Sequence, residues 1–132
     1  MYKAAIFDMD GTILDTITDL KDSTNHALKV NGHRCDYNVR DAARFFGSGV
    51  KVAIAEAGYS DDEVDLIGVE TSYEGDEAEL TAVINSFEEW YPDHCDEKTK
   101  PFEGVIEAIN ELRSKGIRTA VVSNKMHEAA VI

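Results

Sequence analysis

The hydrophobic positions along the chain follow two patterns, a helical period in four stretches and a short β-rich run in two others. Spacings of three and four residues are typical of one face of an α-helix, so each of the four stretches is predicted to be an amphipathic helix. The third stretch, from Leu80 to Tyr91, contains an aromatic stripe. Such a stripe belongs far more often to a hydrophobic core than to a cofactor site, and we interpret it as core. The four faces consist of Ile17, Leu20, Thr24, Ala27 and Leu28; Val50, Ala53, Ile54 and Ala57; Leu80, Val83, Ile84, Phe87, Trp90 and Tyr91; and Val105, Ile106, Ile109 and Leu112.

The two β-rich runs, of which only the first is continuously apolar, predict parallel β-strands. Residues 4–7 form a short run of the kind found in a strand buried on both faces. Residues 117–122 form the second run, which follows the fourth helix and Gly116, the residue expected at a helix C-terminal cap. The order helix, glycine, strand, polar loop and next helix predicts an α/β fold with a Rossmann-like parallel-sheet core.

Too much sequence lies between the two predicted strands for a simple crossover connection. This stretch contains three of the amphipathic helices. We therefore expect residues 17–96 to form an all-helical insert, and residues 1–16 with 97–132 to form part of an α/β core. Two capping-box spacings precede helical segments of the insert, namely Ser60 with Glu63 and Asp76 with Glu79.

A pair of carboxylates directly follows the first predicted strand, in the order Asp8, Met9, Asp10, Gly11 and Thr12. Acids at the carboxyl end of a buried parallel strand lie where open α/β sheets bind ligands. Because burying that much negative charge is costly without a cation or a proton, the pair implies a metal ion. An ordinary acidic turn is the structural alternative. A calcium-binding loop does not fit, because its sixth position requires glycine and holds Ile13 here.

This segment resembles the first signature of the haloacid dehalogenase superfamily, an apolar run followed by D-x-D-G-T. The resemblance implies that Asp8 is the nucleophile. It also implies that Asp10, the second acid carried by the phosphatases and phosphomutases of the superfamily, is the general acid and base. A carboxylate can attack phosphorus to form an aspartyl-phosphate, and a neighbouring carboxylic acid can protonate the leaving alkoxide. We expect Asp8 and the backbone carbonyl of Asp10 to bind Mg²⁺, and Thr12 to support the loop or the phosphate.

The second predicted strand leads into Ser123, Asn124 and Lys125. A serine after a strand is, taken alone, more often structural than functional. Following D-x-D-G-T in one chain at a family-like separation, it resembles the second signature of the superfamily, a Ser or Thr that closes a strand. The resemblance implies that the Ser123 hydroxyl and the Asn124 backbone N–H bind the transferring phosphoryl group. Lys125 is a further candidate phosphate ligand, although a solvated lysine is the simpler interpretation.

Gly47, Ser48 and Gly49 lie between two helices of the predicted insert. Composition alone favours a flexible helix–helix turn. Phosphoglycolate-phosphatase-like members of the superfamily carry a similar G-x-G turn where a helical cap presents its specificity loop, and residues 99–105 resemble the same subgroup. The resemblance therefore implies a substrate-specificity loop at these three residues. It also implies a small phosphorylated metabolite, such as phosphoglycolate, as the substrate.

Composition indicates the type of protein, its partners and its compartment, and says less about the reaction. The 132 residues are 43% hydrophobic, which is typical of a globular protein, and the net charge of −13 argues against nucleic acid or an anionic membrane as a partner. Because the substrate is itself an anion, local cations must offset the negative charge of the chain. The candidates are the metal, Lys125 and Lys51. For Lys51, too, a solvated lysine is the simpler interpretation. The four histidines show no metal-ligand spacing and are assigned to surface or packing positions. Two lone cysteines, without a signal segment or a long apolar run, favour a reduced cytoplasmic setting.

The chain ends a few residues into the helix that follows the second signature. Superfamily members continue with further strands, which carry a Lys that neutralises the phosphoryl group and an acidic pair that completes the metal site. No Lys follows Lys125, and no acid follows Glu128. We therefore expect this chain to be the N-terminal part of a longer phosphatase, with a bare strand edge and an uncovered apolar helix face.

Three functions fit these residues. The first is a Mg²⁺-dependent phosphomonoester hydrolase that acts through an aspartyl-phosphate. The second is a sugar-phosphate mutase of the same fold, similar to β-phosphoglucomutase, in which water must be kept away from the phosphoenzyme. The third is a catalytically incomplete fragment that binds phosphate or a partner; association into a homo-oligomer is left open.

Overall fold

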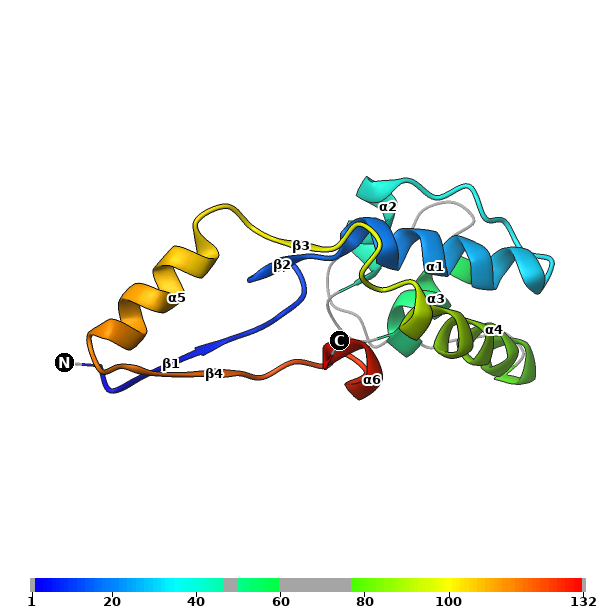
Figure 1. Cartoon of the computed structure of the whole chain (residues 1–132). Coiled ribbons are helices and arrows are strands. Elements are labelled where there is room, and N and C mark those ends of the chain that lie inside the picture. Colours follow the sequence, from blue (N-terminus) through cyan, green and yellow to red (C-terminus); the bar gives the residue numbers. More distant parts are fainter. Residues whose placement is uncertain (1, 47–49, 60–76, 132) are drawn as a thin grey trace.

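The computed structural model describes residues 2–46, 50–59 and 77–131, which form two regions joined by extended connections (Figure 1). One region holds strands β1 (Ala4–Phe7) and β4 (Arg118–Val121) with helix α5 (Val105–Ser114). The other is a helical cluster, which we define as α1 (Ile17–Val30), α2 (Val39–Phe45), α3 (Val50–Tyr59), α4 (Glu77–Trp90) and the 3₁₀ turn η1 (Tyr91–Asp93). The short helix α6 (His127–Ala130) packs on η1. Between the two regions lie strands β2 (Leu14–Asp15) and β3 (Lys100–Pro101).

Strands β1 and β4 pair in parallel, with Ala4 opposite Arg118 and Phe7 opposite Val121. One further hydrogen bond continues the pairing, because the Val122 N–H donates to the Phe7 carbonyl at 2.9 Å. Helix α5 packs on β4 and ends before Gly116, whose φ of 75° is the left-handed conformation expected of a helix-ending glycine. The predicted α/β fold with a parallel-sheet core is therefore confirmed.

The expectation that residues 4–7 are buried on both faces is wrong for this chain. Ile6 is 68% exposed and, on the neighbouring strand, Val121 is 46% exposed. The reason is that, within the residues described, β1 and β4 pair only with each other and α5 is the main helix packed on them. This matches the expected bare strand edge. The apolar face of α5 is likewise incompletely covered, because none of its residues is buried.

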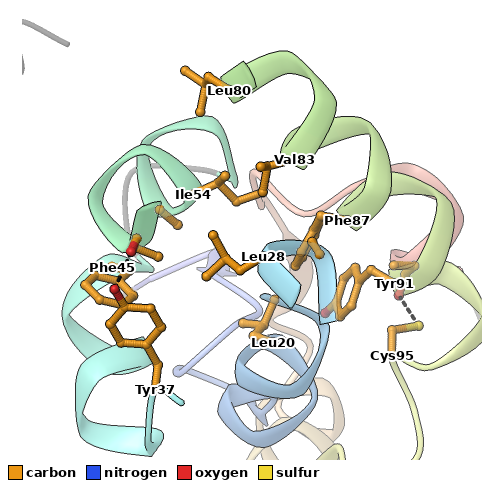
Figure 2. Close-up of a cluster of buried hydrophobic side chains, with 14 residues drawn as sticks. Leu20, Leu28, Tyr37, Phe45, Ile54, Leu80, Val83, Phe87, Tyr91 and Cys95 are labelled. Atoms are coloured by element: carbon orange, nitrogen blue, oxygen red, sulfur yellow. Dashed lines mark hydrogen bonds between the residues drawn. The ribbon is translucent and has the colours of Figure 1, made fainter. Parts of the chain in front are cut away.

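The hydrophobic core lies inside the helical cluster (Figure 2). The predicted faces of α1, α3 and α4 supply most of it, since Leu28, Ile54 and Phe87 are each no more than 1% exposed. Phe87 stacks on Tyr91 with ring centroids 5.0 Å apart, and the Tyr37 hydroxyl donates a hydrogen bond to the Ala57 carbonyl. The interpretation of the aromatic stripe as core is confirmed.

Trp90, at the edge of this core, lies between two histidine rings. The ring centroids of His26 and His94 are 3.7 Å and 3.6 Å from that of Trp90, and both pairs are stacked. These two histidines therefore occupy packing positions, as expected from the sequence.

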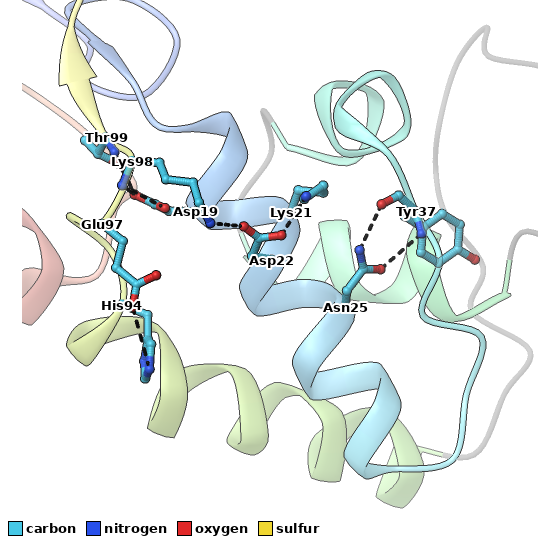
Figure 3. Close-up of polar contacts among 9 residues, drawn as sticks. All are labelled: Asp19, Lys21, Asp22, Asn25, Tyr37, His94, Glu97, Lys98 and Thr99. Atoms are coloured by element: carbon cyan, nitrogen blue, oxygen red, sulfur yellow. Dashed lines mark hydrogen bonds and ion pairs between the residues drawn. The ribbon is translucent and has the colours of Figure 1, made fainter.

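Asp19 ties the helical cluster to the second connection, the stretch from η1 to α5, and nothing in the sequence pattern predicts this contact. Its carboxylate is only 2% exposed and accepts hydrogen bonds from the Lys98 N–H at 2.9 Å and from the Thr99 N–H and hydroxyl, both at 2.8 Å (Figure 3). Next to it, β2 and β3 form a short antiparallel pair in which Asp15 lies opposite Lys100. The two connections thus run side by side near the predicted domain boundaries; those boundaries, at residues 16/17 and 96/97, stay a prediction.

Helix α2 begins with a capping box that the sequence analysis overlooked. The Asn38 side chain accepts hydrogen bonds from the Arg40 and Asp41 N–H groups, and the Asp41 carboxylate accepts one from the Asn38 N–H. Of the capping boxes that were predicted, Ser60, Glu63 and Asp76 lie outside the described residues.

Within residues 2–46, 50–59 and 77–131, no helix combines the length and the apolar character needed to span a bilayer.

Candidate active site

A cavity of about 420 Å³ opens where the carboxyl ends of β1 and β4 face the helical cluster. Polar groups from both strand ends contribute to its lining. The side chains contributed by the helical cluster are mainly apolar. The lining residues are Asp8, Asp10, Gly11, Asp15, Thr16, Ile17, Leu20, Val39, Ala43, Phe46, Val50, Tyr91, Phe102, Ser123, Asn124, Lys125 and Met126. This arrangement offers a charged end for an anionic group and an apolar wall for the remainder of a small ligand.

The turn after β1 presents Asp8 and Asp10 to the cavity. The Met9 carbonyl accepts hydrogen bonds from three successive N–H groups, those of residues 12, 13 and 14, which curl the chain tightly. Gly11 adopts φ 72°, a conformation that side-chain-bearing residues rarely adopt. Asp8 Oδ1 accepts a hydrogen bond of 2.8 Å from the Met9 N–H. The glycine in D-x-D-G-T is therefore required by the turn that positions the two acids.

Ser123 and Asn124 reach the same cavity from the end of β4. Because the hydrogen bond from Val122 to Phe7 extends the strand pairing, these residues directly follow the last paired position. Ser123 Oγ accepts a hydrogen bond of 3.1 Å from the Lys125 N–H, so its own hydroxyl hydrogen is available to donate to a ligand. The two signatures, distant in sequence, thus meet at one edge of the sheet.

Lys125 is buried, and its interpretation as a solvated lysine is wrong. Its side chain is only 3% exposed, and Nζ lies 3.0 Å from Asp10 Oδ1. Nζ also donates a hydrogen bond to the Tyr91 hydroxyl, which comes from the helical cluster. The buried ammonium therefore has a carboxylate and a phenol as partners, as burial of a charge requires. Lys51, in contrast, is exposed, as expected.

Tyr91 is the site residue that sequence reasoning missed. It was assigned to the apolar stripe of α4, and it is indeed 1% exposed and packed in the core. Burial, and next the neighbouring Asp10 carboxylate, raise its pKa well above the usual tyrosine range, so the hydroxyl stays protonated. The signal that could have identified it is a tyrosine, rather than a phenylalanine, at the end of a buried stripe, since a buried phenol needs a polar partner.

The lining of the cavity does not test two further predictions. Thr12 is exposed and does not line the cavity, and its N–H bonds to the Met9 carbonyl; its proposed role stays a prediction. Gly47, Ser48 and Gly49 lie outside the described residues. The residues on either side of that segment, Phe46 and Val50, both line the cavity.

A single divalent cation fits the acidic end of the cavity. Asp8 and Asp10 both line it, and the Asp10 carbonyl accepts none of the backbone hydrogen bonds of the turn, which converge on Met9 and Leu14. Mg²⁺ usually keeps several waters and takes only one or two protein carboxylates. The Asp8 carboxylate and the Asp10 carbonyl could therefore supply two of its ligands. Among the described residues there is no cluster of three or more His, Cys, Asp or Glu side chains able to enclose a metal.

Comparison with known proteins agrees with this geometry. A family model described as haloacid dehalogenase-like hydrolase matches residues 5–131. The phosphoglycolate phosphatases of Mesorhizobium japonicum and Agrobacterium fabrum are 34% and 32% identical, over 91% and 96% of this chain, but over only 48% and 50% of their own lengths. The chain thus spans about half the length of the curated relatives it matches.

A solved structure gives the same result. The crystal structure of a "putative phosphoglycolate phosphatase" from Lactobacillus delbrueckii subsp. bulgaricus superposes with a TM-score of 0.86 and 45% sequence identity. The match covers 97% of this chain and 57% of the solved one.

Proposed function

The chain belongs to the haloacid dehalogenase-like hydrolases, and from this membership we propose that the whole protein hydrolyses small phosphomonoesters through an aspartyl-phosphate on Asp8. The observation that carries the proposal is the convergence of Asp8, Asp10, Ser123, Asn124 and Lys125 on one cavity. Two acids, a hydroxyl, a backbone N–H and an ammonium supply a nucleophile, a proton donor and a set of groups for a phosphoryl anion.

In the first step a carboxylate oxygen of Asp8 attacks phosphorus, and the bond from phosphorus to the leaving oxygen breaks. Asp10, as the carboxylic acid, gives its proton to that oxygen, so the product leaves as an alcohol. In the second step Asp10, now a carboxylate, takes a proton from water as the water oxygen attacks phosphorus, and the bond between phosphorus and the Asp8 oxygen breaks. Inorganic phosphate leaves, and both acids return to their initial states.

The phosphoryl oxygens need positive charge and hydrogen-bond donors throughout. We propose three donors: the Ser123 hydroxyl, the backbone N–H of Asn124, and the ammonium N–H of Lys125 that is not directed to Asp10 or Tyr91. The Asp8 carboxylate and the Asp10 carbonyl are proposed to hold Mg²⁺, which when bound neutralises charge on the phosphoryl oxygens. Because the chain carries a net charge of −13, such local cations are essential for binding an anionic substrate.

The substrate is proposed to be a small phosphorylated metabolite, with phosphoglycolate as the first candidate because relatives carry that name. Gly47, Ser48 and Gly49 are proposed as the specificity loop. Support for this comes from Phe46 and Val50, which flank the loop in sequence and line the apolar wall of the cavity. We further propose that the protein acts in the cytoplasm on free metabolites and without nucleic acid.

The proposal is tested by measuring phosphate release from phosphoglycolate, a sugar phosphate and p-nitrophenyl phosphate, using the whole protein with Mg²⁺. Turnover is expected for at least one of them, with a loss of at least about 10³-fold in Asp8→Asn, because an amide is a poor nucleophile. Asp36→Asn, at an exposed carboxylate paired with Arg34, is the matched control and should retain full activity. Turnover of Asp8→Asn within tenfold of the wild type would reject Asp8 as the nucleophile. Formation of an isomeric sugar phosphate without phosphate release would instead identify a mutase.

A further inference from the structure

We propose that Tyr91 is a positioning residue for the reaction: its hydroxyl holds Lys125 against the Asp10 carboxyl group, so the helical cluster orients the proton donor. This inference rests on the proposed function, because it takes Asp10 to be the acid. It assigns a role to a residue that otherwise belongs to the hydrophobic core.

The contacts form a continuous line from the helical cluster to the acid. Tyr91 lies in the 3₁₀ turn that ends α4, and its ring stacks on Phe87 in the core. Its hydroxyl accepts a hydrogen bond from Lys125 Nζ, and the same Nζ lies 3.0 Å from Asp10 Oδ1. Lys125 and Asp10 belong to the two strand ends, whereas Tyr91 alone of the three comes from the helical cluster.

Donor counting explains why the hydroxyl matters. An ammonium has three N–H donors and no acceptor. In Lys125 one is directed to Asp10 and one to Tyr91, which leaves one for a phosphoryl oxygen. With its side chain 3% exposed, Lys125 has little access to water as a replacement partner. Removing the Tyr91 hydroxyl therefore leaves a buried donor without a partner, and the flexible lysine stem can then turn away from Asp10.

The hydroxyl itself can be isolated from the ring. Lys125 Nζ is also 4.8 Å from the centroid of the Tyr91 ring, close enough for a cation–π contribution. Tyr91→Phe keeps this ring and its stacking on Phe87, and removes only the oxygen. Tyr37→Phe is a matched control, because Tyr37 is also a core tyrosine whose hydroxyl makes a buried hydrogen bond, in its case to the Ala57 carbonyl and away from the cavity.

The first test is a double-mutant cycle with Tyr91→Phe, Lys125→Met and both together, in the whole protein. Tyr91→Phe is expected to lower kcat for an alkyl phosphate about tenfold, with KM little changed, and to lower it less for p-nitrophenyl phosphate, whose leaving group needs no proton. In the Lys125→Met background the same change should cost little more, because the group through which Tyr91 acts is already gone. Tyr37→Phe should leave kcat within about twofold of the wild type.

Three results of the cycle would overturn the proposal. They are equal losses for both substrates, fully additive losses in the double variant, or a loss in Tyr37→Phe as large as that in Tyr91→Phe. The last result would mean that a weakened core, not the contact with Lys125, lowers turnover.

A second test does not depend on activity. The lysines of the folded whole protein are labelled with an amine-reactive reagent, and the rate at Lys125 is compared with that at exposed Lys51 by peptide mass spectrometry. Lys125 is expected to react much more slowly than Lys51 in the wild type and several-fold faster in Tyr91→Phe, with no change in Tyr37→Phe. An unchanged rate in Tyr91→Phe would reject the contact. Faster labelling of Lys125 in a protein that hydrolyses no phosphomonoester would retain the contact and reject the proposed function.

Discussion

Lys125 Nζ and Asp10 Oδ1 lie 3.0 Å apart although 115 positions separate the two residues along the chain. The parallel pairing of β1 with β4 brings them together, because Phe7 lies opposite Val121 and each residue follows its own strand end within a few positions. The ion pair thus places a cation beside Asp10. The register of the two strands therefore determines that this cation and this acid meet at the site.

Asp10→Asn tests the assignment of the acid. Asparagine retains an oxygen that can accept a hydrogen bond from Lys125, but its amide cannot transfer a proton to the leaving oxygen, so the geometry is conserved while the chemistry is lost. We expect kcat for an alkyl phosphate to fall by roughly 10²–10⁴-fold, and less for p-nitrophenyl phosphate. Steady-state kinetics with the two substrates measures the difference, and equal losses would argue that Asp10 does not protonate the leaving oxygen.

Metal removal tests the ligand assignment. Chelation with EDTA is expected to abolish phosphate release, and added Mg²⁺ to restore it. Saturating Mg²⁺, at about 100 times its Kd, should also stabilise the folded protein by about 2.7 kcal/mol, which thermal unfolding detects as a higher Tm. Asp8→Asn should lose most of this shift, whereas the exposed Asp36→Asn should keep it. Full turnover after chelation would show that hydrolysis needs no metal.

Asp19→Ala tests the contact between α1 and the second connection. The substitution leaves the N–H groups of Lys98 and Thr99 without their buried acceptor, so we expect a loss of about 2–4 kcal/mol in the free energy of unfolding. Asp22→Ala is the matched control on the same helix, because its partly exposed ion pairs with Lys21 and Lys98 should contribute less than about 1 kcal/mol. Urea unfolding measures both, and equal losses would mean that the Asp19 contact is not a special support.

Periodicity predicted the helices and strands that bury a regular apolar face or pair in the sheet. Leu28, Phe87 and the β1–β4 pair belong to this group, since local spacing reports directly which side of an element is apolar. Helix α2 escaped prediction because its seven residues are too few for a clear apolar stripe, although its Asn38 cap is visible in the sequence. Short, polar-rich helices give this kind of weak signal.

Site residues that directly follow a strand could be predicted from the sequence. Residues whose contacts join the helical cluster to another part of the chain could not. Asp8, Asp10 and Ser123 follow paired strands, so topology alone places them at one edge of the sheet. Asp19 reads in the sequence as an ordinary acid in the first turn of a helix, and Tyr91 as an ordinary core aromatic. Their partners, Thr99 and Lys125, are distant along the chain, and only the folded arrangement brings each pair together.

Chemical trapping tests whether Asp8 carries the phosphoryl group during turnover. An acyl phosphate is reduced by borohydride, which converts the modified aspartate into homoserine, and mass spectrometry of the peptide containing residue 8 detects the change. We expect homoserine at position 8 when the whole protein is quenched during turnover, and none without substrate or in Asp8→Asn. Rapid release of phosphate with Asp8 unmodified, or with the label on a different residue, would contradict it.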